Sequence, residues 1–198
     1  CCMPNTQPVC DNAAIVGYIV ARAKEVGLCK VRPIGAITRG EQGENLAEMG
    51  KMKAAGAVAV SDDGRPVSDA RMMRLAIEYA SDFGLLCLSH CEDRSLVDGG
   101  VVNEGLNSTL AGLKGIPRAA EEIMLAREII LAETLGKRVH ICHVSTKGGV
   151  QLLRDAKARG VQVTAETCPH YFTLTDDVIV TYDANTKVNP PIREAEDV

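Results

Sequence analysis

The stretch that decides the fold runs from Arg138 to Glu166 and reads RVHICHVSTKGGVQLLRDAKARGVQVTAE. Its first part, Arg138–His143, and its last, Val161–Glu166, are short apolar runs of the kind that form buried strands. Between them, Lys147–Arg159 has apolar residues at helical spacing, and Gly160 follows it as the usual residue for leaving a helix. A strand, a helix and a second strand in this order predict two parallel strands joined by a helix.

The same alternation covers most of the chain and predicts a parallel sheet with helices outside it. Further strands are expected at Val31–Ile37, Ala57–Ser61 and Leu85–His90, and further helices at Asp11–Val26, Glu41–Ala55, Ser68–Phe83 and Arg118–Leu135. Four of these helices are also expected to end at a glycine: Gly27, Gly56, Gly84 and Gly136. Five clear strands fit either an open doubly wound sheet or part of an eight-stranded barrel. Glu92–Gly115 is the one long break and is expected to be a functional loop.

Composition limits the class of protein. A net charge of −4 and an aromatic content of 3% argue against nucleic acid as a partner, and no apolar run is long enough for a bilayer. Eight cysteines without a C-x-x-C pair are expected to be reduced, which favours the cytoplasm. The 198 residues fall short of the roughly 250 of a closed (β/α)8 barrel. Because no methionine begins the chain, we expect a single partial domain, 1–198, from inside a longer protein.

Ionisable residues stand where successive strands are expected to end. Asp62 and Asp63 follow one strand, and His90 and His143 each end another. Because the carboxyl ends of parallel strands form the active-site rim in α/β folds, these side chains are expected to surround one mouth. Carboxylate and imidazole groups together suit a divalent metal such as zinc.

Two histidines and two cysteines near these positions receive weaker assignments. Strand alternation places His140 on the face opposite His143, so only one of them is expected to point inward, and we assign that place to His143. His170 follows a proline and is expected to support the site or face the substrate rather than bind metal. Cys91 and Cys142 lie beside candidate ligands, so a thiolate ligand stays an alternative.

Six motifs in order carry a resemblance to class I dihydroorotases and cover nearly the whole chain. They are Met3-Pro4-Asn5-Thr6-x-Pro8, Ser61-Asp62-Asp63-Gly64-x-Pro66-Val67, His90-Cys91-Glu92-Asp93, His143-Val144-Ser145-Thr146, Thr164-Ala165-Glu166-x-x-Pro169-His170 and Lys187-x-Asn189-Pro190-Pro191-x-Arg193. The resemblance implies an incomplete (β/α)8 metal-dependent hydrolase barrel with about five to six of the strands present. It also implies an enzyme that interconverts N-carbamoyl-L-aspartate and L-dihydroorotate in pyrimidine synthesis, with two zinc ions in its complete site.

The resemblance assigns roles to particular residues. His90 and His143 match metal-binding histidines, and the bridging carboxylate lies in Asp62-Asp63, where the spacing to His90 favours Asp63. Asn5 and Asn189 match substrate-binding asparagines. For Arg193, pairing with a substrate carboxylate and a structural salt bridge both stay open.

The family also has functional residues that this sequence does not contain. An H-x-H-x-R motif is expected before Met3, and an aspartate that shuttles the proton is expected beyond Val198, so no proton-transferring residue is assigned here. We therefore expect these 198 residues by themselves to be inactive and poorly stable. Related functions stay open: an allantoinase or dihydropyrimidinase, or a non-catalytic scaffold for aspartate transcarbamoylase. A homodimer is a further expectation for the parent protein.

Overall fold

The computed structural model describes every residue from Cys1 to Val198. It divides into two compact units, the first made of Cys1–His90 with Leu131–His140 and the second of Cys91–Ile130 with Ile141–Val198. The main sheet has five strands in the order β1-β2-β3-β6-β7, so strands far apart in the sequence are neighbours in it. Strand β6 (Val139–Ile141) contains the boundary between the units. The prediction of a single domain is left as a prediction.

Three parallel strands form the sheet of the first unit. They are β1 (Ile34–Ala36), β2 (Ala59–Ser61) and β3 (Leu86–Ser89), and the register places Ile34 beside Ala59 and Ala59 beside Leu86. Every residue of β1 and β2 is buried, as expected where both faces of a parallel sheet are covered. The predicted strands are confirmed, although each is shorter than its apolar run.

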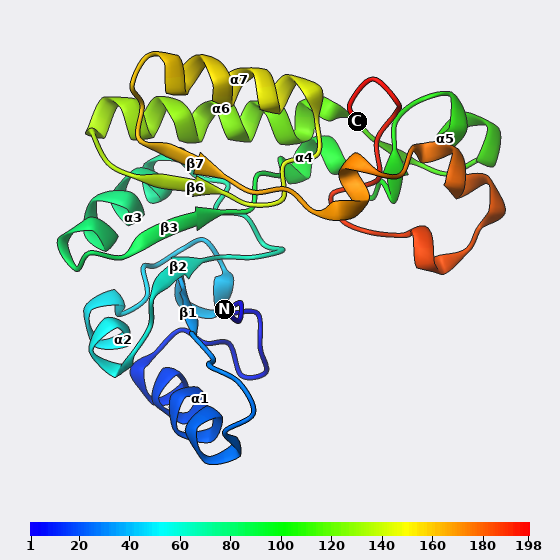
Figure 1. The fold of residues 1–198 in the computed structure, drawn as a ribbon. Helices are drawn as coiled ribbons and strands as arrows, with labels where there is room; N and C mark the ends of the chain where they lie inside the picture. Colours follow the sequence, from blue (N-terminus) through cyan, green and yellow to red (C-terminus); the bar gives the residue numbers. More distant parts are fainter. The chain divides into compact units, whose positions relative to one another are not determined.

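The helices of this unit alternate with its parallel strands along the chain (Figure 1). They are α1 (Ala13–Val26), α2 (Met49–Ala55) and α3 (Ala70–Asp82), and α2 packs against both of the others. Helix α3 buries Met73, Ala76, Ile77 and Ala80, whose spacing gives one apolar stripe. The five glycines expected at helix ends all have positive φ angles: Gly27, Gly56, Gly84, Gly136 and Gly160.

The helix predicted over Glu41–Ala55 is wrong in its first half. Residues Arg39–Glu41 form a single 3-10 turn, and the helix begins only at Met49. Gly43 has a φ of 76°, which an α-helix cannot contain, and its N–H donates to the hydroxyl of Thr38 at 2.9 Å. The turn directs the Glu41 side chain inward, where it is only 5% exposed.

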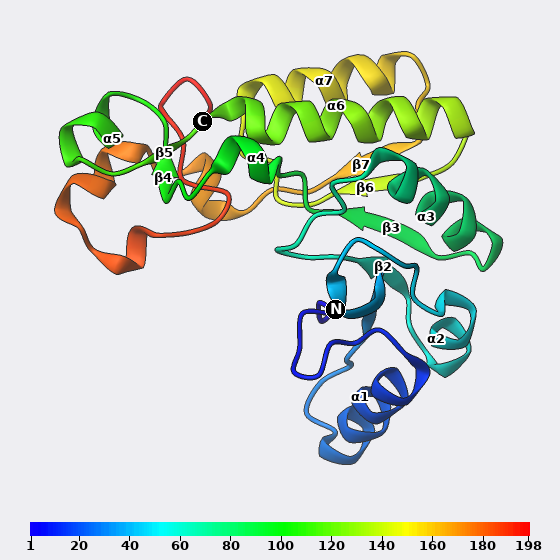
Figure 2. The same ribbon diagram turned by 180° about the vertical axis from the view of Figure 1, so that it is seen from behind.

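The long loop predicted at Glu92–Gly115 is also wrong, because this part of the second unit is folded. It contains α4 (Arg94–Val97), β4 (Val102–Asn103) and α5 (Leu106–Ala111), and β5 (Gly115–Ile116) follows. Strands β4 and β5 form a small parallel ribbon (Figure 2). Polar residues that resemble a loop in sequence serve as caps; for example, the Asp93 carboxylate accepts from two backbone N–H groups at the start of α4.

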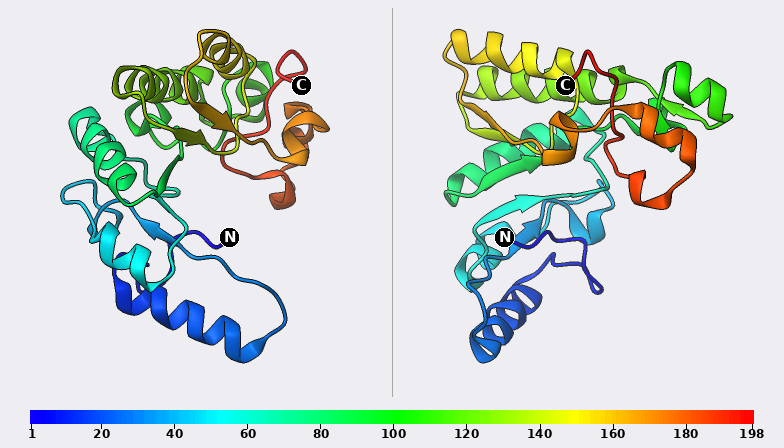
Figure 3. Two further views of the ribbon diagram at one scale, coloured as in Figure 1. Left: turned by 60° about the vertical axis from the view of Figure 1, so that its left-hand side comes forward. Right: turned by 45° about the vertical axis from the view of Figure 1, so that its right-hand side comes forward.

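Two long helices lie side by side in the second unit (Figures 1 and 3). Helix α6 (Arg118–Leu135) lies in this unit up to Ile130, and its last residues belong to the first unit. Helix α7 (Lys147–Ala158) lies wholly in the second unit and precedes strand β7 (Val163–Ala165). The remainder forms the 3-10 helices η2 (Pro169–Phe172), η3 (Asp176–Thr181) and η4 (Ala184–Thr186). None of the helices has both the length and the apolar character needed to cross a membrane.

We expect Gly115→Ala to destabilise the protein by about 1 to 3 kcal/mol, because a methyl group there meets backbone. A Cβ built on Gly115 lies 2.5 Å from the Cα of Glu104, which cannot rotate away. Gly17→Ala is the matched control, because no atom lies within 4 Å of its Cβ in helix α1. It should stabilise by up to about 1 kcal/mol through helix propensity. Urea unfolding measures both, and equal midpoints for the two variants would contradict the packing argument.

Candidate metal centre

The two aspartates after β2 have different surroundings. Asp62 is 2% exposed and accepts hydrogen bonds from the backbone N–H groups of Ile37, at 2.7 Å, and Thr38, at 3.1 Å, and from the Thr38 hydroxyl. Asp63 is only partly buried, and its Oδ2 accepts from Nδ2 of Asn5 at 3.3 Å. Asp62 therefore ties the end of β2 to the end of β1, whereas Asp63 faces Asn5. The preference for Asp63 as the bridging carboxylate stays a prediction.

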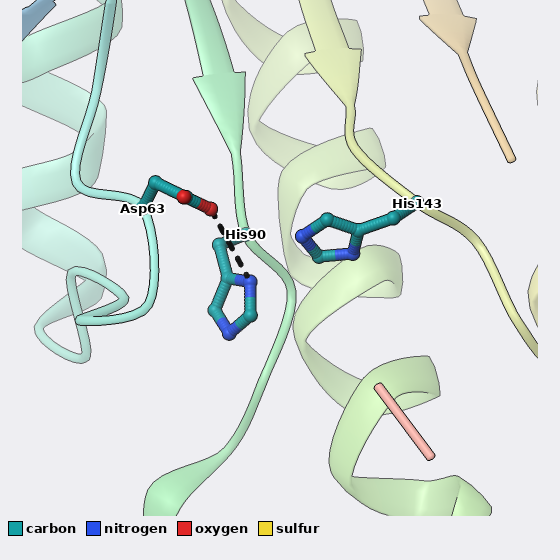
Figure 4. A group of neighbouring side chains, drawn as sticks. All are labelled: Asp63, His90 and His143. Carbon is teal, nitrogen blue, oxygen red and sulfur yellow. Dashed lines mark ion pairs between the residues drawn. The ribbon is translucent and has the colours of Figure 1, made fainter. Parts of the chain in front are cut away.

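His90 and Asp63 lie next to each other within the first unit. His90 directly follows β3, is 4% exposed, and its Nδ1 lies 3.8 Å from Oδ1 of Asp63 (Figure 4). The sheet register explains the pairing, because β2 and β3 are adjacent and their carboxyl ends lie at the same edge. Two strand ends thus bring together a carboxylate and an imidazole that are separated by 26 intervening residues in sequence.

Electrostatics at this edge are dominated by buried carboxyl groups. Burial raises the pKa of Asp62 to about 6, opposed by the hydrogen bonds from Thr38 and Ile37. Burial also raises the pKa of Glu41 to about 7, and repulsion from Asp62 adds to the effect. Sequence reasoning missed Glu41 because it was placed in a helix, and no local signal shows that its turn points inward.

His143 lies in the second unit, two residues after the end of β6. Its φ is 38°, a left-handed value that few non-glycine residues adopt. Glu166 bonds to the backbone before and after His143: its N–H donates to Ile141 O at 3.0 Å, and its carbonyl accepts from Val144 N at 2.9 Å. A regular parallel ladder would use Ile141 and His143, so one extra residue is inserted here, as in a β-bulge. The strict alternation used to separate His140 from His143 therefore does not extend past Ile141.

The two asparagines are both exposed and each lies against a carboxylate. Asn5 donates to Asp63, and Nδ2 of Asn189 donates to Oε1 of Glu92 at 2.9 Å. Because only the NH2 side of an amide can donate, the Glu92 contact fixes which side of Asn189 faces the carboxylate. Glu92 was not singled out from the sequence, where it lies 97 residues from its partner.

Of the two roles left open for Arg193, the structure supports the structural one. It is 2% exposed, and its guanidinium donates to Ser145 Oγ at 3.1 Å and to Asn103 Oδ1 and Ile116 O at 3.0 Å each. Burial lowers the pKa of Arg193, while the nearby carboxylate of Glu121 acts in the opposite direction. With its donors engaged in the interior, Arg193 is not placed to pair with a substrate carboxylate.

The remaining candidates have no role that the structure demonstrates. The His170 ring packs against Tyr171, with the ring centroids 4.1 Å apart. Cys91 and Cys142, the alternative thiolate ligands, are both buried and form no disulfide. His140 and Cys142 also belong, with Glu166, to a second set of groups with metal-binding chemistry.

We expect Asp62→Ala to lower the free energy of unfolding by at least about 2 kcal/mol, because three buried donors would lose their acceptor. Asp63→Ala, at a partly exposed position, should change it by less than about 1 kcal/mol and should instead weaken divalent metal binding. Urea unfolding of the metal-free variants, followed by zinc titration, separates the two roles. Stronger loss of zinc binding in Asp62→Ala than in Asp63→Ala would reverse the assignment.

Comparison with solved structures identifies the class to which this fold belongs. The L-hydantoinase (dihydropyrimidinase) from Arthrobacter aurescens matches 98% of this chain and 45% of its own with a TM-score of 0.79 at 22% identity. The dihydropyrimidinase from Brevibacillus agri matches 93% of this chain and 42% of its own with a TM-score of 0.70 at 16% identity. The fold is that of the hydantoinase-type barrel proteins, and the predicted fold, an incomplete parallel α/β barrel, is confirmed.

The chain belongs to the dihydro-orotase-like family, whose model matches residues 1–149. The curated relatives include the dihydroorotases of Trichlorobacter lovleyi, 58% identical over 198 residues, and Pelotomaculum thermopropionicum, 61% identical over 197 residues. The matches cover 100% of this chain but 47% and 46% of those proteins. The chain therefore spans about half the length of the curated relatives it matches.

Proposed function

We propose that the complete protein containing these residues is a dihydroorotase, which hydrolyses the cyclic amide of L-dihydroorotate to N-carbamoyl-L-aspartate and catalyses the reverse reaction. The observation that supports this most strongly is the pairing of Asp63 with His90 at adjacent strand ends, in a chain 58–61% identical to proteins named dihydroorotase. A hydantoinase-type activity is the second candidate, favoured only by the solved structures that share the fold.

The proposal includes a divalent metal, zinc in the first instance, held by Asp63, His90 and His143. These side chains offer one carboxylate oxygen and two imidazole nitrogens, a donor set that suits zinc (Figure 4). A zinc ion bound there would polarise the amide carbonyl and lower the pKa of a bound water. Within this chain, Asp63 contributes negative charge to the centre, and the buried position of His90 keeps its ring in a fixed orientation.

Asn5 and Asn189 are proposed to bind the substrate beside the metal. Glu92 takes one donor of the Asn189 amide, so the amide oxygen is directed away from that carboxylate and can accept from a ring N–H of the substrate. The Asn5 amide is held by Asp63 in the same manner. Each asparagine would thus recognise the cyclic amide through its oxygen and a remaining N–H.

The complete protein is also proposed to act in the cytoplasm on a small molecule, without nucleic acid or membrane as a partner. The 198 residues are proposed to form one partial barrel domain, with the remaining metal ligands and the proton-transferring aspartate supplied from outside them. A homodimer, or association with aspartate transcarbamoylase, remains a proposal for the parent protein.

The proposal is tested by purifying the complete protein with zinc and comparing its turnover of L-dihydroorotate, hydantoin, dihydrouracil and allantoin. We expect kcat/KM for L-dihydroorotate to exceed the others by at least about 100-fold, because a site built to hydrogen-bond a polar group rejects substrates that lack it. A preference for hydantoin or dihydrouracil would support the second candidate. No metal retention and no turnover of any of the four would indicate a non-catalytic scaffold.

A further inference from the structure

The backbone at His143 is held in a conformation that is uncommon for any residue other than glycine. A φ of 38° costs some free energy at a residue with a Cβ, and it persists only where the surroundings fix it. The groups that fix it must act on the residues around His143 in the second unit. The direction of its imidazole then depends on those groups.

A buried carboxylate holds the segment that follows His143. Glu121, in the first turn of helix α6 and 4% exposed, accepts from the backbone N–H groups of Ser145 and Thr146 at 3.0 Å each. It also accepts from both hydroxyls, that of Thr146 at 2.9 Å. One side chain thus satisfies four donors of two consecutive residues, which fixes the path of the chain just beyond His143.

A buried arginine, Arg193, also bonds to this segment. Besides its bond to Ser145 Oγ, the Arg193 guanidinium lies 3.9 Å from the carboxylate of Glu121. Asn103 extends the chain of contacts, because it accepts from Arg193 and donates to the buried Asp176 at 3.0 Å. Val144 is held separately by its bonds to Glu166 and to the Thr167 hydroxyl at 2.7 Å.

Stability alone is a poor explanation for this arrangement. A buried ion pair recovers little more than the cost of removing both charges from water, and an apolar pair of the same size often stabilises a fold equally well. Its advantage is a single defined geometry. A defined geometry matters here because the segment follows His143, whose backbone is strained and whose side chain is a proposed metal ligand.

We infer that Glu121 and Arg193 are positioning residues, which hold His143 in its metal-binding orientation through the backbone of Val144–Thr146. Neither side chain belongs to the candidate ligand set of Asp63, His90 and His143. The inference rests on the proposed function in one respect, since it takes His143 to be a metal ligand. The role of the pair in fixing the segment does not depend on that step.

The test uses the double variant Glu121→Gln/Arg193→Met in the complete protein, because removing both charges together leaves neither buried without its partner. Asp98→Asn/Lys114→Met is the matched control, because it also removes one carboxylate and one cation that pair with each other. Asp98 and Lys114 lie in the same unit, are both exposed and pair at 2.6 Å. Two properties are measured: hydrogen exchange of the Ser145 and Thr146 amides in the metal-free proteins, and the zinc dissociation constant by chelator competition.

We expect the double variant to exchange the Ser145 and Thr146 amides at least about tenfold faster and to bind zinc about 10- to 100-fold more weakly, whereas Asp98→Asn/Lys114→Met changes neither by more than twofold. Exchange and zinc affinity equal to the wild type would overturn the inference, as would equal losses in the control. If the wild-type protein itself binds no zinc, the proposed function fails, and the exchange rates still decide whether the pair fixes this segment.

Discussion

Replacing His143 with asparagine in the complete protein is expected to remove most of its zinc and to lower kcat/KM for L-dihydroorotate by about 10³-fold or more, equivalent to roughly 4 kcal/mol of transition-state stabilisation. Asparagine is the informative substitute because it tolerates the left-handed backbone found at His143. The bulge is therefore kept while the imidazole nitrogen is lost. The loss can then be assigned to the ligand rather than to the fold.

His140→Asn is the matched control for this prediction. It replaces the same residue type three positions earlier, within strand β6, where the side chain is half-buried. We expect zinc content, measured by atomic emission after dialysis, to stay within twofold of the wild type. A loss of zinc in His140→Asn with retention in His143→Asn would show that the other histidine of this strand is the ligand.

Glu41→Gln is expected to stabilise the metal-free protein at pH 8 by about 1 to 3 kcal/mol and to leave its stability at pH 4 nearly unchanged. Burial raises the pKa of Glu41 from 4.5 to about 7 in the folded state, so folded protein holds a proton there that unfolded protein has lost. Between these two values the stability of the wild type therefore falls as pH rises, and the full cost is present above pH 7. Glutamine is neutral throughout and avoids that cost.

Urea unfolding between pH 4 and pH 8 measures this effect. Asp62, whose pKa is also raised, acts in the same direction in both proteins, and the repulsion between Asp62 and Glu41 that the variant removes is part of the expected gain in stability. Glu44→Gln removes a charge from an exposed position of the same segment and should change stability by less than about 0.5 kcal/mol at either pH. A gain in stability for Glu41→Gln that is equal at pH 4 and pH 8 would contradict the ionisation argument.

Several elements of the fold could be predicted because their signals are local. The helix over Arg118–Leu135 has the same bounds in the sequence analysis and in the structure, since its apolar spacing and the preceding proline lie within one segment. The helix predicted from Glu41 failed because Gly43 has a left-handed conformation, which a periodicity argument does not include. Folded structure in Glu92–Gly115 was missed because its helices and strands are too short to have a detectable period.

Some features of the candidate site could likewise be predicted from the sequence, and others could not. The sequence by itself determined the family, the parallel α/β class and the strand-end positions of Asp63, His90 and His143, because motif order and strand period are properties of the chain. Only the tertiary structure decided that Asp62 is a buried tie, that Arg193 is an interior residue paired with Glu121, and that a bulge accompanies His143. These facts depend on hydrogen bonds between residues 22 to 90 positions apart, and such partners are set by packing rather than by any local pattern.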